Sequence, residues 1–404
     1  MRTCLLLLTT PFILAACEAD ADPAANGPAT VIETIGDTTV VRTVSGSVWG
    51  AEATLVPEVS IGELDGPDEY LFGFITSIAA DDDLRVYAFD FQAQHVQVYD
   101  SLGTYVATLG RPGEGPGEFN RAEAIAMLPD NRLVVRNPGN QRIEVFGPEA
   151  GQTEQWRYGA GGLHSVTPLY TDMHGRTLVN IVDRSGDPSS RVLVTQLLVL
   201  GPDGTPADTL AEPSSPSATR FGPFNPAFHW TVHSSGHFLT GLSSEYRIDL
   251  ARDDGVLRIE RAADPVPVLE EERAYARERF VRGMRQMDPD WSWDGPPIPS
   301  HKPFFSALLS GRDGRIWVRV ATEGYPVENE DHDPENPSSV PVLWREPVRY
   351  DVFEPDGTYL GAVAPPDGFA FSNPFFDGDY VWGVTRDELG VARVVRFRIV
   401  VGGG

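Results

Sequence analysis

The sequence predicts an all-β fold, a six-bladed β-propeller with four strands in each blade. A short apolar run, a polar turn and a second run of β-branched or aromatic residues recur six times along the chain. A second hairpin follows each of these units, so each repeat holds about four strands. Gly and Pro are also abundant, at 40 and 34 of the 404 residues, which suits repeated hairpins and linkers. Such repeats, stacked around an axis, are typical of a propeller.

The polar turn is the most regular part of each repeat. Asp, Asn or Gly occupies every one of these turns, because these residues accept the left-handed or Asx-turn backbone that a tight hairpin needs. The six turns are Asp82-Asp83-Leu84, Asp130-Asn131-Arg132, His174-Gly175-Arg176, Ser235-Gly236-His237, Asp313-Gly314-Arg315 and Asp377-Gly378-Asp379.

The second hairpin of each repeat varies more. It is clearest over residues 96–110, 197–210 and 350–363, where two apolar runs flank a Gly-containing turn. Less regular versions lie at residues 142–151 and 246–259. Two hairpins in a row give the four strands expected of one blade.

Residues 78–119 resemble an NHL repeat almost throughout, and the linker GRPGEGPGEF at residues 110–119 is the most specific part. The whole chain is similar to the bacterial six-bladed propeller lipoproteins, a family mostly without assigned activity. The resemblance is strong over residues 60–147 and weaker after that. The fourth and fifth blades depart from the pattern because they carry long insertions.

The last repeat is short. It runs over residues 375–400 and has room for three strands. We expect the segment at residues 53–64, which precedes the first blade, to supply the missing outer strand. A ring closed in this way by an N-terminal strand leaves no exposed sheet edge between its two ends.

The first residues predict export. Residues 1–16 combine Arg2 with a short apolar run and read as a signal peptide. The run ends in Leu14-Ala15-Ala16-Cys17, which resembles the lipobox of bacterial lipoproteins. That resemblance implies a lipid on Cys17 and attachment to the membrane through it. The alternative is an ordinary secretory signal cleaved near Ala15-Ala16. Glu18 follows, and the absence of Asp there favours the outer membrane, facing the periplasm or the cell surface.

The remaining chain divides into two parts. Residues 17–45 are polar and rich in Ala, Thr and Gly, so we expect a flexible tether. The alternative for its Thr/Val-rich part is an additional strand. Residues 46–401 form the single propeller domain. Cys4 leaves with the signal, so the domain holds no cysteine, no disulfide and no thiol chemistry.

Charge and motifs exclude several functions. A net charge of −26 argues against nucleic acid as a partner, because nucleic-acid-binding surfaces are basic. The nucleophile elbow, the HExxH motif and the P-loop are all absent, so no catalytic residue is assigned. We expect the protein to be a monomer. We also expect a binding protein and not an enzyme.

One insertion has a helical pattern. Residues 268–288, in the fourth blade, place acidic residues in the first turn and arginines toward the end, as the helix dipole favours. A Pro-rich loop with Trp291 and Trp293 follows. Two placements are open: the insertion lies over the central channel and shapes a pocket, or it packs on the side of the propeller.

Histidines are few in this sequence and are the first candidates for metal ligands. His164, His229 and His301 each lie near the entry to an inner strand, where propellers carry sites at the channel mouth. Three imidazoles there would suit zinc. Their distances in sequence to the following turn glycine differ, however, so the sequence favours hydrogen-bonded or exposed histidines and predicts no cofactor.

Calcium at the acidic loop 327–336 is a weaker alternative, because the fixed spacing of a known calcium loop is missing.

These residues give the candidate site at the channel mouth: His164, His229, His301, Lys302, Trp291 and Trp293. The first functional hypothesis is a lipid-anchored propeller of the cell envelope that binds a ligand or scaffolds a protein. The alternative is a metal-assisted hydrolase or lyase with its site at the channel mouth. A third is a sensor or carbohydrate-binding protein that uses the loop with the two tryptophans.

Overall fold

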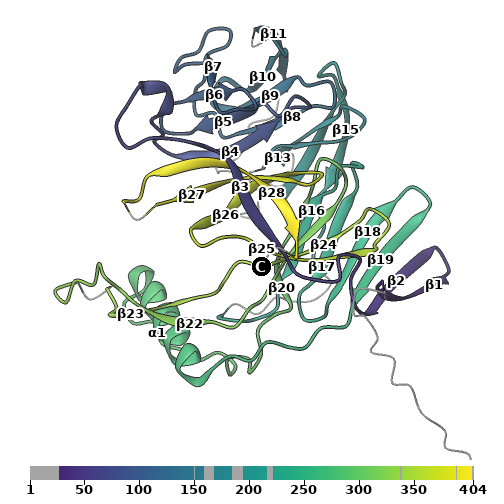
Figure 1. Ribbon diagram of the computed structural model, residues 1–404, viewed down its shortest axis with the longest axis vertical. Helices are drawn as coiled ribbons and strands as arrows, with labels where there is room; N and C mark the ends of the chain where they lie inside the picture. Colours follow the sequence, from purple (N-terminus) through teal and green to yellow (C-terminus); the bar gives the residue numbers. More distant parts are fainter. Residues whose placement is uncertain are drawn as a thin grey trace, which may run out of the picture.

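A computed structural model of the chain describes residues 27–149, 151–158, 168–183, 194–215, 222–336, 339–387 and 389–402. Within these ranges the regular structure is nearly all β, with one α-helix and many small, mainly antiparallel sheets (Figure 1). The all-β class expected from the sequence is therefore confirmed.

The first two sheets are each built from four consecutive strands. The first contains β4 (Ile75–Ala80), β5 (Val86–Asp90), β6 (His95–Tyr99) and β7 (Tyr105–Leu109), and a short 3-10 helix (Asp68–Tyr70) precedes it. The second contains β8 (Ala124–Met127), β9 (Leu133–Asn137), β10 (Arg142–Phe146) and β11 (Gln152–Arg157), with a 3-10 turn (Pro138–Asn140) between β9 and β10.

The next two sheets follow the same order. The third contains β12 (Tyr170–Thr171), β13 (Thr177–Asp183), β14 (Val194–Leu200) and β15 (Pro206–Ala211). The fourth contains β16 (Phe228–Val232), β17 (Phe238–Leu242), β18 (Arg247–Arg252) and β19 (Gly255–Arg261), and two N-terminal strands extend it, β2 (Thr38–Ser45) and β1 (Ala29–Ile35).

The last two units share one continuous sheet. The fifth contains β20 (Phe305–Ser310), β21 (Ile316–Val320), β24 (Tyr350–Phe353) and β25 (Tyr359–Ala364), and the sixth contains β26 (Phe369–Asp377), β27 (Tyr380–Arg386) and β28 (Ala392–Val401). The strand β3 (Ala53–Ile61) pairs antiparallel with β28 along its length and meets β25 over two residues. The sixth unit thus draws its fourth strand from the N-terminal part of the chain.

The expected tether is shorter than the sequence suggested. From Ala29 onward its Thr/Val alternation forms the hairpin β1–β2, and β2 pairs parallel with β19. The alternating β-branched residues explain this, because they suit a strand and bury Val40, Val41 and Thr43 against the fourth sheet. Residues 17–26 lie outside the described residues.

The two insertions pack together. The helix α1 (Glu270–Met287) follows β19, close to the expected 268–288, and the hairpin of β22 (Tyr325–Glu328) and β23 (Val342–Arg345) interrupts the fifth sheet. Figure 1 shows α1, β22 and β23 set to one side of the sheets. None of their residues lines the central cavity described below. The described residues therefore support the second of the two placements, in which the insertion packs on the side of the sheets and not over the central cavity.

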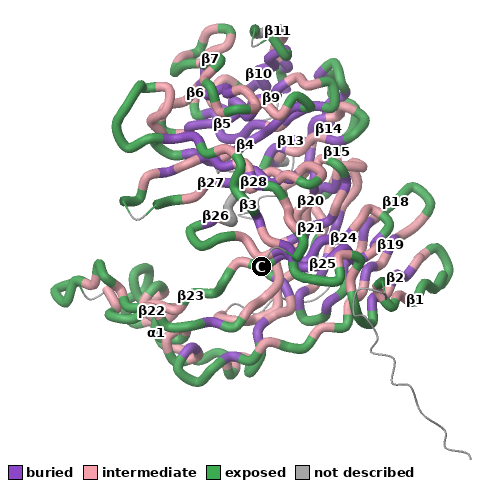
Figure 2. Tube along the Cα trace, viewed as in Figure 1, coloured by how far each residue is buried: buried purple, intermediate pink, exposed green. Residues whose placement is uncertain are grey.

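The hydrophobic core is divided into six clusters. Each cluster joins side chains of two successive sheets, and one of the six joins the sixth sheet to the first. Phe89 of β5 and Phe119 before β8 meet edge to face in one of them, for example, with ring centroids 6.3 Å apart. Apolar burial between neighbouring sheets, and not within a single sheet, thus holds the units together (Figure 2).

The six turns expected from the sequence all join the first strand of a unit to its second. Gly175, Gly236 and Gly314 adopt positive φ there, with values of 76°, 84° and 88°. At the corresponding place Asn131 takes φ 63°, which Asn tolerates better than most residues. The turn residues are therefore matched to the backbone that each hairpin requires.

Candidate functional site

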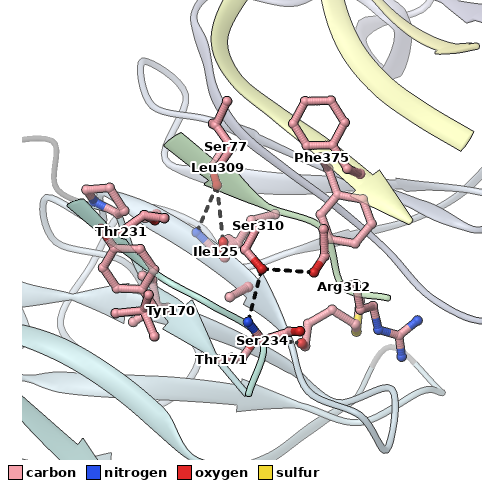
Figure 3. A pocket seen from close by; sticks show the side chains of 18 of the residues that line it. Ser77, Ile125, Tyr170, Thr171, Thr231, Ser234, Leu309, Ser310, Arg312 and Phe375 are labelled. Carbon is pink, nitrogen blue, oxygen red and sulfur yellow. Dashed lines mark hydrogen bonds between the residues drawn. The ribbon is translucent and has the colours of Figure 1, made fainter. Parts of the chain in front are cut away.

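A cavity lies where the first strands of all six units come together. Its volume is about 590 Å³. Each unit contributes residues from or beside its first strand, that is from β4, β8, β12, β16, β20 and β26, and Figure 3 shows it from close by. The first strands are edge strands of their sheets, so their side chains and free backbone edges form the wall.

Hydroxyl side chains join these first strands to one another. Ser77 Oγ on β4 donates to the carbonyl of Ile125 on β8 at 3.1 Å, and Thr171 Oγ1 on β12 donates to the carbonyl of Met127 at 2.9 Å. The backbone N–H of Ser234 donates to Ser310 Oγ at 3.0 Å (Figure 3). Small hydroxyls thus satisfy backbone groups that no neighbouring strand pairs.

One end of the cavity is closed by Arg312. Its guanidinium lies 2.6 Å from Asp82 Oδ1 in the first unit, 3.2 Å from Asn131 Oδ1 in the second and 3.4 Å from Asp377 Oδ2 in the sixth. A hydrogen bond from Asn131 is the main cause that lowers the pKa of Asp82, and Arg312 adds to it. Burial raises the pKa of Asp377, and Arg312 offsets only part of that effect.

The other end carries a buried carboxyl group, Glu123. This residue precedes β8, whereas Asn131 follows that strand, so Glu123 and Arg312 lie at opposite ends of the cavity. Glu123 Oε2 is 3.3 Å from Nη1 of Arg136, a side chain that is itself fully buried. Burial raises the pKa of Glu123 to about 7, and Arg136 only partly opposes the rise.

Several buried polar atoms near Glu123 lack hydrogen-bond partners. They are Arg136 Nε and Asn180 Oδ1, and Glu123 Oε2 and Arg136 Nη1 have only their ion pair with each other at 3.3 Å. Arg136 Nη2 does donate to the carbonyl of Asn180 at 3.0 Å, which ties the second unit to the third. Buried polar atoms without partners are uncommon. Of these residues Glu123 alone lines the cavity, so its carboxyl group is the polar group that faces a ligand at this end.

Aromatic side chains supply much of the apolar wall. The rings of Tyr170 and Trp230 are tilted toward each other with centroids 6.4 Å apart, and both line the cavity together with Phe375. Leu308, Leu309 and Met127 add aliphatic surface. The cavity therefore combines ring faces with hydroxyl and carboxyl groups.

The histidines chosen from the sequence lie in three different settings. His164 lies outside the described residues. His229 is half-buried on β16 against the ring of Phe305, with centroids 5.5 Å apart, and burial lowers its pKa. His301 is exposed, and its Nδ1 lies 3.0 Å from Ser300 Oγ. Neither His229 nor His301 lines the central cavity.

Lys302, Trp291 and Trp293 belong to the neighbourhood of α1. Lys302 Nζ is buried between Glu272 Oε1 at 2.6 Å and Glu346 Oε1 at 2.8 Å. The two tryptophans pack on each other and on Phe280 of α1. A second cavity of about 580 Å³, between α1 and Trp344 of β23, lies beside the lysine. These three residues therefore contribute to the insertion and not to the central cavity.

The described residues contain no group of three or more His, Cys, Asp or Glu side chains placed to hold a metal ion. The acidic loop 327–336 is described in full and forms no such group.

Sequence reasoning missed Glu123 and Arg312. Both are charged residues at the ends of first strands, Glu123 just before β8 and Arg312 just after β20. A charged side chain directly beside the apolar first strand of a repeat was the available signal, since such positions lie next to the cavity wall.

No family model matches the chain, and no curated protein does. Among solved structures, a DUF4221 family member from Bacteroides vulgatus is similar over 87% of this chain and 99% of its own, with 9% identity and a TM-score of 0.51. A candidate exported protein of Bacteroides fragilis has 9% identity, coverage of 90% and 100%, and a TM-score of 0.46. A gluconolactonase from Xanthomonas campestris has 14% identity, coverage of 81% and 86%, and a TM-score of 0.39. The likeness to the DUF4221 family member is one of fold alone.

In the described part of the chain, α1 is too polar to cross a membrane, and no other helix there is long enough.

Proposed function

We propose that this chain is an exported six-bladed propeller, closed by β3, that binds a small molecule in its central cavity. The observation that carries the proposal is the cavity of about 590 Å³ walled by the first strands of all six units. That volume is in the range of about 300–1,000 Å³ that small-molecule sites occupy. Arg312 closes one end, so a ligand enters from the end that carries Glu123.

The lining favours a neutral ligand of sugar size with an apolar face. Tyr170 and Trp230 offer ring faces for stacking, and Glu123 offers a hydrogen-bonding carboxyl group. Stacking on aromatic rings combined with hydrogen bonds to polar groups is how such ligands are held in concave sites. A strongly charged ligand is disfavoured, because Arg312 is already paired with Asp82.

The export part of the proposal rests on the N-terminal sequence. Cys17 directly follows a short apolar run that ends in Leu14-Ala15-Ala16. We propose a lipid on Cys17 that holds the propeller at the cell envelope. Replacing Cys17 with Ser should release the protein from the membrane fraction. Continued membrane association of the C17S protein would count against the lipid anchor.

The binding proposal is tested by filling the cavity. Ala126 on β8 lines it, so Ala126→Trp should occupy the ligand's space, whereas Val106→Trp places the same ring on the exposed face of β7. Thermal-shift measurements with a panel of monosaccharides and aryl glycosides should give a hit for the natural protein and the V106W variant, with loss of the shift in A126W. A panel without hits, or hits that A126W retains, would overturn the proposal.

A metal-assisted hydrolase or lyase was the alternative from the sequence. It depends on His164, His229 and His301 converging, and no observation among the described residues favours it.

A further inference from the structure

The fourth sheet ends in an unpaired strand. Its order is β16, β17, β18, β19, β2 and β1, so β2 is paired on both sides and β1 on one side only. In Figure 1, β1 lies at the rim, beyond β2, and Figure 2 shows it exposed. Its outer row of backbone N–H and C=O groups is free to pair with another strand.

The side chains of β1 do not protect this edge. Ile32 and Ile35 are 67% and 66% exposed, Val31 is 41% exposed, and Glu33 is the only charged residue of the strand. Proteins usually protect an exposed edge with charge, proline or a covering element. An apolar edge without these devices favours strand addition.

The outer strands of three other units expose fewer large apolar side chains than β1 does. In the third unit, β15 begins with Pro206 and carries Asp208. In the second, β11 carries Glu154 and Arg157. In the first, the backbone N–H of Tyr105 on β7 is bonded to the hydroxyl of Tyr70 at 3.0 Å. Of these four outer strands, β1 alone exposes three large apolar side chains, whereas β7 exposes one, Val106.

We propose that β1 is a self-association site, at which two copies of the chain pair antiparallel through this strand, centred on Ile32. In that register Ile32 faces its counterpart, Thr30 faces Thr34, and Val31 faces Glu33. The one charge of the strand therefore never meets itself, and each cross-strand pair is compatible with a sheet. A register centred on Glu33 would oppose two carboxylates.

A second copy is the occupant that the chain itself favours. This argument rests on the lipid anchor proposed above: residues 18–28 separate Cys17 from β1, so copies attached to one membrane would hold this strand near it at raised local concentration. The net charge of −26 on each copy opposes association at long range. Self-pairing through β1 should therefore strengthen with ionic strength, since salt screens that repulsion.

A single cysteine tests the register. In a signal-processed chain carrying Cys17→Ser no cysteine remains, so Ile32→Cys introduces the only thiol. Opposed residues of an antiparallel pair have Cα atoms about 4.5–5.5 Å apart, within the span of a disulfide. Val44→Cys is the matched control, because Val44 is 51% exposed but lies on β2, which is paired on both sides.

Mild oxidation should cross-link the I32C protein into a dimer several times faster than the V44C protein, and more so at 0.5 M than at 0.05 M salt. Light scattering of the cysteine-free chain should show a concentration-dependent dimer that Ile32→Lys abolishes without changing the unfolding temperature by more than a few degrees. Equal cross-linking of the two variants, or a monomer at all concentrations, would overturn the proposal.

Discussion

Arg312, in the turn between β20 and β21, reaches Asp82, in the turn between β4 and β5, at a distance of 2.6 Å. These two residues are 230 positions apart and belong to the fifth and first units. The same guanidinium also contacts the second and sixth units through Asn131 and Asp377. One side chain therefore ties four units together at the closed end of the cavity.

Replacing Arg312 with Ala should lower the free energy of unfolding by about 1–2 kcal/mol, because hydrogen bonds to charged groups are lost but Asp82 remains largely exposed. Urea unfolding measures the change. Arg252→Ala is the control, since the side chain of Arg252 donates an exposed hydrogen bond to the carbonyl of Pro355, and its loss should cost less than about 0.5 kcal/mol. Equal losses in the two variants would contradict the role given to Arg312.

The contact between β3 and β28 gives a second prediction. Leu55 on β3 is buried in the cluster between the fifth and sixth units, whereas its neighbour Val56 is 43% exposed. Leu55→Ala should therefore cost about 2–4 kcal/mol of unfolding free energy, as truncations in a core do. Val56→Ala should cost less than about 1 kcal/mol. Similar values for the two would mean that β3 contributes little to holding the ends of the chain together.

Much of the fold was predictable because its signals are local. A tight turn needs Asp, Asn or Gly at fixed places, so the turns around Asn131, Gly236 and Gly314 could be read directly from the sequence. The addition of β2 to β19 could not, since Thr38–Thr43 pairs with Val256–Arg261 across more than two hundred residues. A parallel contact between distant segments leaves no pattern in either segment.

The candidate site was less predictable for a related reason. The residue type suggested His229 and His301, but a side chain belongs to the cavity only if it lines the space between the first strands, and neither histidine does. Glu123 and Arg312 meet that condition, and the residue types around them are ordinary. Lys302 is the only lysine of the chain, and its burial between Glu272 and Glu346 gives it a role in the insertion instead.

The pair of Glu123 and Arg136 gives a prediction about pH. The folded-state pKa of Glu123 is raised from its ordinary 4.5 to about 7, so the folded protein holds this proton more tightly than the unfolded chain does. The contribution of Glu123 to stability therefore falls as the pH rises from about 4.5 to 7, by about 3 kcal/mol in total.

Arg136→Met should enlarge this dependence. Removing the guanidinium takes away the one charge that lowers the pKa of Glu123, so the pKa should rise further. The variant should lose up to about 1.4 kcal/mol more unfolding free energy than the natural protein between pH 5 and pH 8, because its Glu123 stays protonated at pH 8, where the carboxyl group of the natural protein has ionised. Urea unfolding at both pH values measures this. In the double variant with Glu123→Gln the extra loss at pH 8 should disappear, and its persistence would assign the effect to another group.

His233 should make the protein sensitive to acid. Its Nε2 lies 2.8 Å from the carbonyl of Gly314, which only accepts hydrogen bonds, so Nε2 carries the proton and Nδ1 is free to accept one from Ser235. Burial lowers the pKa of His233, with smaller contributions from Arg252 and His237. The unfolded chain therefore binds this proton more readily, and stability should fall as the pH drops below about 6.5, the ordinary value for histidine.

His233→Gln separates this effect from those of other groups, because the amide NH₂ replaces the Nε2 donor to Gly314 but does not titrate. At pH 7.5 the variant should lie within about 1 kcal/mol of the natural protein. Between pH 7.5 and 5 it should lose less unfolding free energy than the natural protein, as measured by urea titrations at both values. His237→Gln is the comparison, since His237 pairs with the exposed carboxylate of Asp253 and is itself partly exposed. If H237Q reduced the acid sensitivity as much as H233Q does, the burial of His233 would not be its source.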